Sequence, residues 1–445
     1  MGILDKNLEY YILDETIDTN IKTLGECKIE SPLSGVTFYH DEFKIIYNIQ
    51  EFNIARHFYE GTMPKSVEVA GPRRKIFFDP KKTKAAIVSC GGLCPGLNNV
   101  IRDITMGLYY NYGVTEIYGI RYGYRGFIEK YGYEPIKLTP DVVDDLHTKG
   151  GTILASSRGS QPKSEIVDFL EKHNINILFA IGGDGTLKGA HQIYEEITKR
   201  GAKISVIGLP KTIDNDIAFI SKTFGFETAV SVATEAVNAA HTEAKGAFNG
   251  IGLVKLMGRE SGFIAAATAL ASNEANFVLI PEMDWDLYGP NGFLDQLKKR
   301  IVERHHALII VAEGAGQEFI PSTGYDASGN KKLGDIGLFL KEKIIEFFAK
   351  EGVEITLKYI DPSYIIRSVP ANSNDSIYCT NLAQSAVHAA MAGKTDVCVG
   401  LLHDTYIHIP IPLVISHRKK VDLHSTFWQS VLMSTGMKPM KNPQK

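Results

Sequence analysis

Two carboxylates and a lysine follow a short apolar segment in the stretch GLPKTIDNDI, residues 208–217. Asp214 and Asp216 are two residues apart, so in a loop both can point into one cleft. A hydroxyl that attacks phosphorus needs a carboxylate to accept its proton and a second group to fix the geometry or a metal. Lys211 adds a cation that can face the transferring phosphoryl group. The stretch indicates phosphoryl transfer, although an Asx-rich turn would also explain the acidic triplet alone.

A second stretch, AIGGDGTLKGA at residues 180–190, predicts a strand, a glycine turn and the start of a helix. Glycines let backbone N–H groups approach a phosphate, and the amino end of a helix favours negative charge. Asp184 would repel a bare phosphate, so it indicates a bound Mg²⁺ that bridges phosphates. The stretch is neither a GxxxxGKS/T loop nor the GxGxxG turn of dehydrogenases. NAD kinases and lipid kinases share GGDGT, so the stretch predicts a chemistry and leaves the substrate open.

Further polar stretches follow apolar segments in the same way. SCGGLCPGLNN at residues 89–99 is another glycine-rich turn, and GGTILASSRG at residues 150–159 carries Arg158, whose planar guanidinium suits phosphate. Arg259 in KLMGRESG and Glu313 in VAEGAG each follow a run of apolar residues. Each signal alone is compatible with a solvated loop or a strand cap. Their repetition along one edge of a sheet predicts a binding site.

Short apolar segments must position these polar residues. Six segments have strand length: residues 84–90, 175–181, 204–209, 250–256, 277–280 and 306–312. Helical patterns lie between them; apolar residues at positions 100, 101, 104 and 108 share one helical face. This alternation predicts an α/β fold, doubly wound, with mainly parallel sheets and helices on both faces. Ligands bind beyond the carboxyl ends of the strands in such sheets, where the polar stretches lie.

The amino-acid composition limits the classes of function that the protein can have. The 445 residues are 44% hydrophobic and 22% charged with a formal net charge of -3, so no basic field predicts nucleic-acid binding. No apolar run approaches the roughly 20 residues of a membrane-spanning helix, and the first residues lack a signal-peptide pattern. The five cysteines form no CxxC pair, which is typical of reduced thiols. We therefore expect a cytoplasmic protein with no nucleic-acid and no membrane partner.

Six motifs, in their order along the chain, resemble the phosphofructokinase family: GGLCPGLNNVIR, ILASSRG, AIGGDGTLKGA, GLPKTIDNDI, KLMGRESGFIA and DPSYIIR. The resemblance covers roughly residues 84–400, and TIDND together with MGR excludes the NAD and lipid kinases. It implies phosphoryl transfer to the 1-hydroxyl of fructose 6-phosphate, which gives fructose 1,6-bisphosphate. It also implies two Rossmann-like lobes, Mg²⁺ as cofactor, allosteric control and a homo-oligomer, with a tetramer favoured over a dimer.

The roles that the resemblance implies carry over motif by motif. Asp214 resembles the base that takes the sugar hydroxyl proton, Asp216 supports the metal or the base, and Asp184 resembles the Mg²⁺ ligand. The expected catalytic residues are Asp214, Asp216, Lys211, Thr212 and Arg259. The expected ATP site comprises Gly91, Gly92, Arg158, Gly159, Gly183, Asp184, Gly185 and Thr186. The expected sugar-phosphate site comprises Thr212, Ile213, Asp214, Met257, Gly258, Arg259, Glu313, Lys358, Tyr364, Ile365, Ile366 and Arg367.

Two departures from the family pattern concern the sugar phosphate. Short bacterial members carry arginines, contributed by a neighbouring subunit, where this chain has Gly250 and Lys358. Lys255 could replace part of that charge, although an ammonium is a point charge and not a fork. We therefore expect Arg259 and Arg367 to make the firmer phosphate contacts.

The choice between ATP and pyrophosphate depends on two positions. Pyrophosphate users in the family show GGDD, whose second aspartate fills the space of the ATP α-phosphate and repels it. Gly185 stands there in this chain and leaves room, which favours ATP. Lys211 is typical of pyrophosphate users, but a cation stabilises a transferring phosphoryl group from either donor. We therefore predict an ATP-dependent 6-phosphofructokinase of glycolysis.

Two alternatives to that prediction are kept. One is a reversible pyrophosphate-dependent phosphofructokinase. The other is a regulatory, non-catalytic homologue, which would be expected to lose Asp184, Asp214 or Arg259; this chain has all three.

Composition and motif order divide the chain into four regions. We expect an N-terminal extension at residues 1–80, a first α/β lobe with the nucleotide site at 81–235, a second α/β lobe with the sugar-phosphate site at 236–403, and a tail at 404–445. Within the tail, HIPIPLVI predicts an edge strand because of its prolines, and SHRKK at residues 416–420 predicts a solvated turn.

Overall fold

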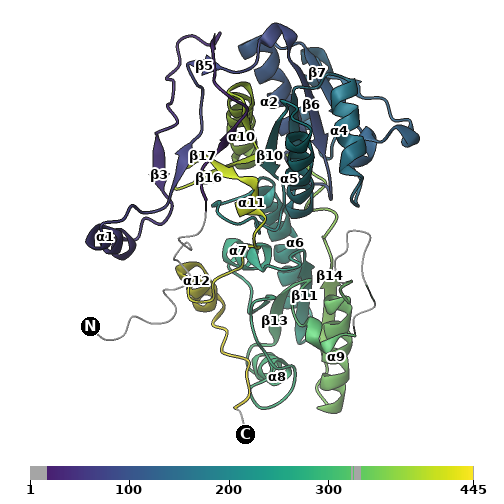
Figure 1. The fold of residues 1–445 in the computed structure, drawn as a ribbon. Coiled ribbons are helices and arrows are strands. Elements are labelled where there is room, and N and C mark those ends of the chain that lie inside the picture. Colours follow the sequence, from purple (N-terminus) through teal and green to yellow (C-terminus); the bar gives the residue numbers. More distant parts are fainter. Residues whose placement is uncertain (1–17, 322–323, 325–331, 444–445) are drawn as a thin grey trace.

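The computed structural model describes residues 18–321, 324 and 332–443. Within these residues, nine strands form a large sheet and four strands form a smaller one, and the two sheets lie one above the other in Figure 1. Helices pack against both sheets. The predicted α/β fold with mainly parallel sheets is confirmed.

The large sheet has the strand order β3-β4-β17-β16-β10-β9-β6-β7-β8. Its central strands are parallel: β16 (Val397–Leu402), β10 (Ser205–Pro210), β9 (Ile177–Gly182), β6 (Lys84–Ser89) and β7 (Glu116–Ile120). Antiparallel strands flank them: β3 (Lys44–Ile46), β4 (Ser66–Val69) and β17 (Thr405–Pro410) on one side and β8 (Ile136–Lys137) on the other. The segments predicted at 84–90, 175–181 and 204–209 thus form neighbouring strands of one sheet.

Helices cover both faces of the large sheet because successive strand residues point to opposite sides. In β9, Phe179 belongs to one apolar cluster and Leu178 to the other. The first cluster includes residues of α2 (Leu97–Met106) and α10 (Ser373–Met391), and the second includes residues of α4 (Lys163–Lys172) and α5 (Asp184–Lys199). The sheet is therefore buried from both sides, as the continuous apolar strands require.

The smaller sheet is parallel throughout, in the order β12-β13-β11-β14. Its strands are β12 (Phe277–Leu279), β13 (His306–Ala312), β11 (Gly250–Leu256) and β14 (Thr356–Ile360). The helices packed against it are α6 (Phe226–Gly246), α7 (Phe263–Ser272), α8 (Phe293–Arg304) and α9 (Ile336–Lys350). Here too, the carboxyl ends of parallel strands form a single edge.

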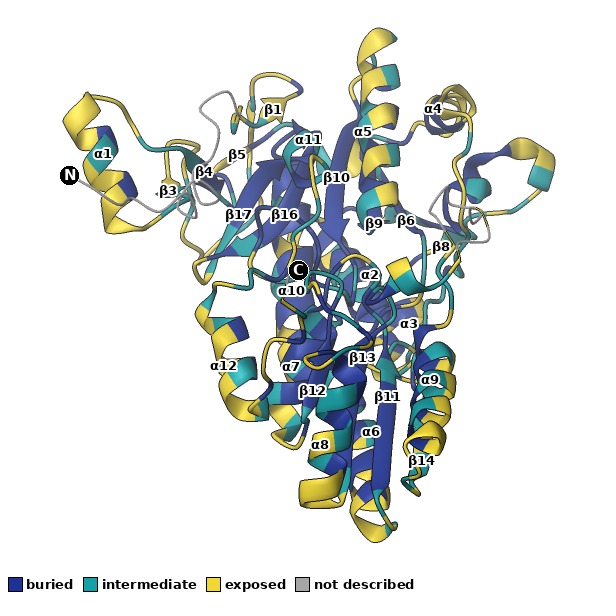
Figure 2. Cartoon of the chain, turned by 90° about the horizontal axis from the view of Figure 1, so that it is seen from below, coloured by how far each residue is buried: buried dark blue, intermediate teal, exposed yellow. Residues whose placement is uncertain are grey.

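The N-terminal extension pairs with distant parts of the chain. β1 (Lys22–Thr23) pairs with β15 (Lys394–Thr395), and β4 pairs with β17. By contrast, α1 (Glu51–Glu60) stands away from the body of the molecule and is largely exposed (Figures 1 and 2). Strand pairing therefore crosses the predicted boundary at residue 80. It also crosses the one at residue 403, because β16 and β17 pair antiparallel.

The prediction of an edge strand in HIPIPLVI is wrong. β17 lies between β16 and β4, and His408 pairs with Glu68 of β4. Pro410 is the last residue of the strand, and Pro412 lies in the short helix α11 (Ile411–Val414). The prolines therefore end the strand without breaking an interior hydrogen bond. Beyond it, α12 (Thr426–Thr435) packs against α7. No helix in the described part of the chain is long and apolar enough to cross a membrane.

Candidate active site

The loop after β10 carries the predicted acids and is fixed by its own side chains. The Thr212 hydroxyl accepts a hydrogen bond from the Asp214 N–H (3.1 Å), and the Thr223 hydroxyl donates to the Thr212 carbonyl (2.6 Å). Asn215 has a left-handed backbone (φ 54°), which its short polar side chain tolerates. Its Oδ1 accepts from the Thr223 N–H (3.0 Å). The loop is therefore held in one shape before any ligand binds.

Asp214 has a carboxylate oxygen without a partner. Its Oδ1 is buried and finds no hydrogen-bond partner among the described residues. Burial, together with the charges of Asp216 and Glu313, raises the pKa of Asp214 to about 8. A buried carboxylate of raised pKa with a free oxygen is equipped to accept a proton from a substrate hydroxyl.

Lys211 joins the two glycine turns. Its side chain is buried, and its Nζ donates to the Gly92 carbonyl oxygen (2.8 Å). A Cβ on Gly91 would lie 3.7 Å from this Nζ, and one on Gly183 would lie 3.3 Å from the Lys211 carbonyl oxygen. Burial lowers the pKa of Lys211. The structure thus brings both turns to the end of β10.

The GGDGT turn begins α5, with Gly183 as the N-cap and Asp184 as the first helical residue. Thr186 closes the first turn by donating from its N–H to the Gly183 carbonyl (2.9 Å). Gly185 is exposed, and no described atom lies within 4 Å of the point where its Cβ would stand. The position thus faces open space beside the amino end of a helix, where anions bind.

The acids fit the coordination chemistry of Mg²⁺. Mg²⁺ takes oxygen ligands and is commonly bound by one or two carboxylates together with substrate phosphates and water. Asp184 and Asp216 both lie within 4 Å of the same guanidinium, that of Arg418. No group of three or more potential ligands occurs among the described residues. Asp184 and Asp216 therefore suit a metal that is shared with a phosphate ligand.

Two arginines from distant motifs meet at the glycine turn after β6. A Cβ on Gly92 would lie 3.1 Å from Nη1 of Arg367 and 3.9 Å from Nη2 of Arg158. Gly91 donates from its N–H to the Ser157 carbonyl (3.2 Å), which ties the ILASSRG loop to the turn. Gly159 is exposed at the end of that loop. Both guanidiniums and the Lys211 ammonium therefore lie close to Gly92.

At the end of β11, the MGR motif lies against the end of β13. Gly258 has a φ of 132°, and a Cβ there would lie 2.6 Å from the Ser261 carbonyl oxygen, so glycine is required. The Gly314 N–H donates to the Gly258 carbonyl (3.0 Å). Burial raises the pKa of Glu313, and the charge of Arg259 opposes this shift. Met257, which precedes this turn, is partly buried.

Residues 84–390 match the model of the phosphofructokinase family. The chain belongs to this family. A protein of Borreliella burgdorferi named ATP-dependent 6-phosphofructokinase is 52% identical over 448 residues, covering 97% of this chain and all of that protein (100%). The Arabidopsis thaliana ATP-dependent 6-phosphofructokinase 5, chloroplastic, is 50% identical over 82% of this chain and 68% of its own length. A solved pyrophosphate-dependent phosphofructokinase from Marinobacter aquaeolei has a TM-score of 0.66 and covers 82% of this chain and 94% of that one; at 19% identity this likeness concerns the fold.

Not every residue expected from the phosphofructokinase resemblance reaches the centre of this site. Ile213 and Ile366 are buried in the apolar core, whereas Tyr364 and Ile365 are 74% and 62% exposed. Lys358 is exposed on β14, the edge strand of the smaller sheet. Its side chain is therefore open to solvent in the single chain.

Lys255 is already paired. Its Nζ lies 2.9 Å from Asp335 and 2.8 Å from Asp361. Burial disfavours the charged form, but the hydrogen bonds to both acids outweigh it and raise the pKa of Lys255. Two carboxylates thus neutralise the cation that we expected could replace a missing phosphofructokinase arginine.

The SHRKK segment is not the solvated turn that the sequence predicts. The Arg418 guanidinium lies 3.3 Å from Asp216 and 3.8 Å from Asp184. The Lys419 Nζ donates to three oxygens: Asn215 Oδ1 (3.2 Å) and the carbonyls of Ile220 (3.0 Å) and Ser221 (2.9 Å). Burial lowers the pKa of Lys419 to about 8. The run of basic residues that begins two positions after the apolar segment is the one sequence signal that points to them.

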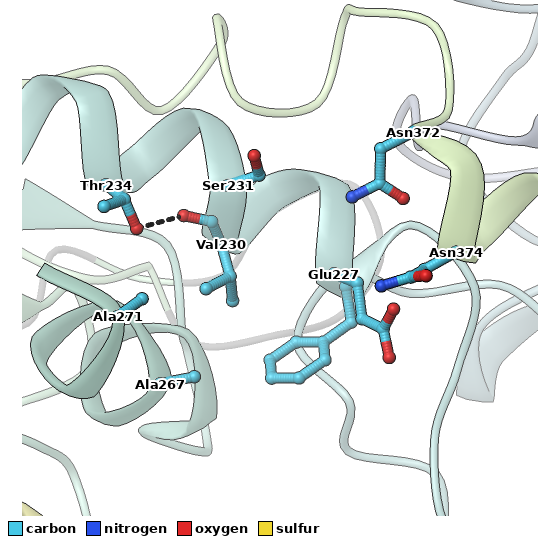
Figure 3. A pocket seen from close by; sticks show the side chains of 9 residues that line it. Glu227, Val230, Ser231, Thr234, Ala267, Ala271, Asn372 and Asn374 are labelled. Carbon is cyan, nitrogen blue, oxygen red and sulfur yellow. Dashed lines mark hydrogen bonds between the residues drawn. The ribbon is translucent and has the colours of Figure 1, made fainter.

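A separate hollow lies outside this site. A cavity of about 420 Å³ opens between α6, α7 and the start of α10, lined by Glu227, Ser231, Asn372 and neighbouring residues (Figure 3). The Thr234 hydroxyl, also on its wall, donates to the Val230 carbonyl of its own helix (2.8 Å). None of the predicted site residues lines this cavity.

Proposed function

We propose that this chain is an ATP-dependent 6-phosphofructokinase, which transfers the γ-phosphoryl group of ATP to the 1-hydroxyl of D-fructose 6-phosphate. The products are fructose 1,6-bisphosphate and ADP. Relatives that carry this name are 44–52% identical over most of the chain, and this is the observation that carries the proposal. The chemistry of the site agrees with it, because the buried, unpartnered oxygen of Asp214 can receive the hydroxyl proton.

The remaining roles follow from position and charge. Lys211 places its ammonium against the glycine turn that follows β6, where it would offset charge on the transferring phosphoryl group. Arg158 supplies a forked donor for the phosphates of ATP and Arg367 supplies one for the sugar phosphate, and both guanidiniums lie near Gly92. Mg²⁺, held by Asp184 with Asp216 beside it, would neutralise the phosphates when it is bound.

We also propose a homo-oligomer in the cytoplasm. Lys358, exposed on an edge strand, suits the sugar phosphate of a neighbouring copy, in line with the family resemblance. All five cysteines are free thiols, as in reducing compartments. Light scattering after size-exclusion chromatography tests the assembly; a tetramer is expected, and a monomer contradicts the proposal.

The decisive test supplies each donor in turn. Purified full-length protein is assayed for fructose 1,6-bisphosphate with fructose 6-phosphate, Mg²⁺ and either ATP or pyrophosphate. We expect turnover with ATP, its loss when EDTA is added, and none with pyrophosphate. Turnover with pyrophosphate alone would support the second candidate, which Lys211 favours, and no turnover with either donor would support a regulatory homologue.

A further inference from the structure

Residues 417–421 cross the active site and lie outside the stretch that matches the family model. We call them the C-terminal strap. The Lys419 N–H donates to the Asp216 carbonyl (2.9 Å), and Arg418 forms an isolated antiparallel bridge with Ile217. The strap therefore pairs like a short strand with the loop that follows β10. This pairing and the three hydrogen bonds of the Lys419 ammonium hold the backbone of Arg418 in position.

The other end of the strap is tied to the smaller sheet. Val421 is buried, and its N–H donates to Oε1 of Glu282 (2.8 Å), which follows β12. The same oxygen accepts the Gly262 N–H (3.0 Å) at the start of α7. In addition, the Lys419 ammonium lies 5.3 Å from the centre of the Phe263 ring in α7. The strap thus bridges the carboxyl edges of both sheets.

The two terminal nitrogens of the Arg418 guanidinium lie close to two different carboxylates. Nη1 lies 3.3 Å from Asp216 Oδ2, and Nη2 lies 3.8 Å from Asp184 Oδ2. Both carboxylates are largely buried, with 8% and 16% of their side chains exposed, so their mutual repulsion is poorly screened. A planar fork can hold two separate carboxylates at fixed positions, which a single ammonium cannot do equally well. Lys188 also pairs with Asp184, from the side of α5 (3.0 Å).

We propose that Arg418 is a positioning residue for phosphoryl transfer. It holds the carboxylates of Asp184 and Asp216 side by side, in the arrangement that receives the metal of a metal–nucleotide complex, and the C-terminal strap holds Arg418 in place. This inference rests on the proposed function, because it assigns Arg418 to the donor side of that reaction. Partners that orient metal ligands are worth about 10- to 100-fold in metal affinity or activity.

The test uses full-length protein with Arg418→Met and Arg418→Lys. The matched control is Lys420→Met, which removes one positive charge from the same strap at an exposed residue. Steady-state kinetics give kcat and the KM for fructose 6-phosphate. Calorimetry gives the affinity for the non-hydrolysable ATP analogue AMPPNP, once with Mg²⁺ and once with EDTA. Thermal melting reports folding.

For Arg418→Met we expect kcat to fall about 10- to 100-fold while the sugar KM changes less than about twofold. The affinity for Mg·AMPPNP should fall by a similar factor, and that for metal-free AMPPNP should not change. Arg418→Lys should recover part of both losses, and Lys420→Met should match the wild type. If Arg418→Met does not fold, the partial loss in Arg418→Lys carries the test.

Unchanged kcat in Arg418→Met overturns the inference, and so does an equal loss of metal-free and metal-bound nucleotide, because that pattern means general damage. Full wild-type behaviour of Arg418→Lys also overturns it. These outcomes differ from failure of the proposed function, in which the wild-type protein itself does not phosphorylate fructose 6-phosphate with ATP.

Discussion

In the loop that follows β10 most side chains are buried, whereas the DPSYIIR segment after β14 exposes Tyr364 and Ile365. Lys211 and Asp216 are 5% and 7% exposed, while Tyr364 is 74% exposed. The loop is tied down by Thr212, Asn215 and the C-terminal strap. Arg367, the last residue of this segment, reaches over Gly92 at the edge of the large sheet.

This contrast corresponds to two roles: the buried loop takes part in the reaction, and the exposed segment binds the substrate. A group that accepts a proton in a transition state must be held before the substrate arrives, because reorganising it would add to the barrier. A segment that grips a ligand can be ordered by that ligand and stay exposed in its absence. We therefore expect substitutions at the large-sheet edge to lower kcat and those in the DPSYIIR segment to raise KM.

The largest effect is expected at Asp214. Asp214→Asn keeps the size of the side chain but removes the proton acceptor, so kcat should fall about 10²- to 10⁴-fold. The KM for fructose 6-phosphate should change little. Steady-state assays check this, with Asp141→Asn, an exposed acid of the same lobe, as the control. Near-normal turnover would refute the assignment of Asp214 as the base.

Gly185→Asp should separate the donors. A like charge about 4 Å from a phosphate costs about 1 kcal/mol in water and about 4 kcal/mol near a protein surface, so kcat/KM for ATP should fall between about fivefold and about 1,000-fold. Gly185→Asn adds nearly the same volume without charge and should lose less. Undiminished ATP turnover in Gly185→Asp would remove the argument that this position selects the donor.

Stability should respond to pH through Asp214. Its pKa is about 8 in the folded chain and about 3.9 in an unfolded one. Between these values the folded state binds more protons, so this group makes the protein less stable as pH rises from about 4 to about 8. Asp214→Asn carries no such charge, and its Tm should exceed that of the wild type by more at pH 8.5 than at pH 5. An equal difference at both pH values would contradict the raised pKa.

The smallest effect is expected at Tyr364. The Arg367 guanidinium lies 4.9 Å from its ring centre, and such an exposed contact contributes about 0.5–1 kcal/mol. Tyr364→Ala should raise the sugar KM about two- to fivefold with kcat unchanged, and Tyr364→Phe should behave like the wild type. A fall in kcat would mean that this exposed segment takes part in the reaction, which would contradict the contrast between the two regions.

The sequence predicted what depends on local pattern. The strands β6, β9, β10, β11, β12 and β13 coincide with apolar segments whose ends carry polar residues, because parallel strands buried on both faces need continuous apolar runs. It could not predict the C-terminal strap, since Arg418 meets Asp216 and Asp184 only after 202 and 234 residues of chain have folded between them. Similarly, the partners of Lys255 come from a helix start and a loop that no local pattern links.

The contrast between the two edges is tested most directly by calorimetry of two ligands on two variants. Mg·AMPPNP and fructose 6-phosphate are each titrated into Gly185→Asp and Arg367→Met. The account predicts that Gly185→Asp loses affinity for the nucleotide and keeps that for the sugar phosphate, whereas Arg367→Met does the reverse. Equal losses of both ligands in either variant, or the opposite pattern, would contradict it.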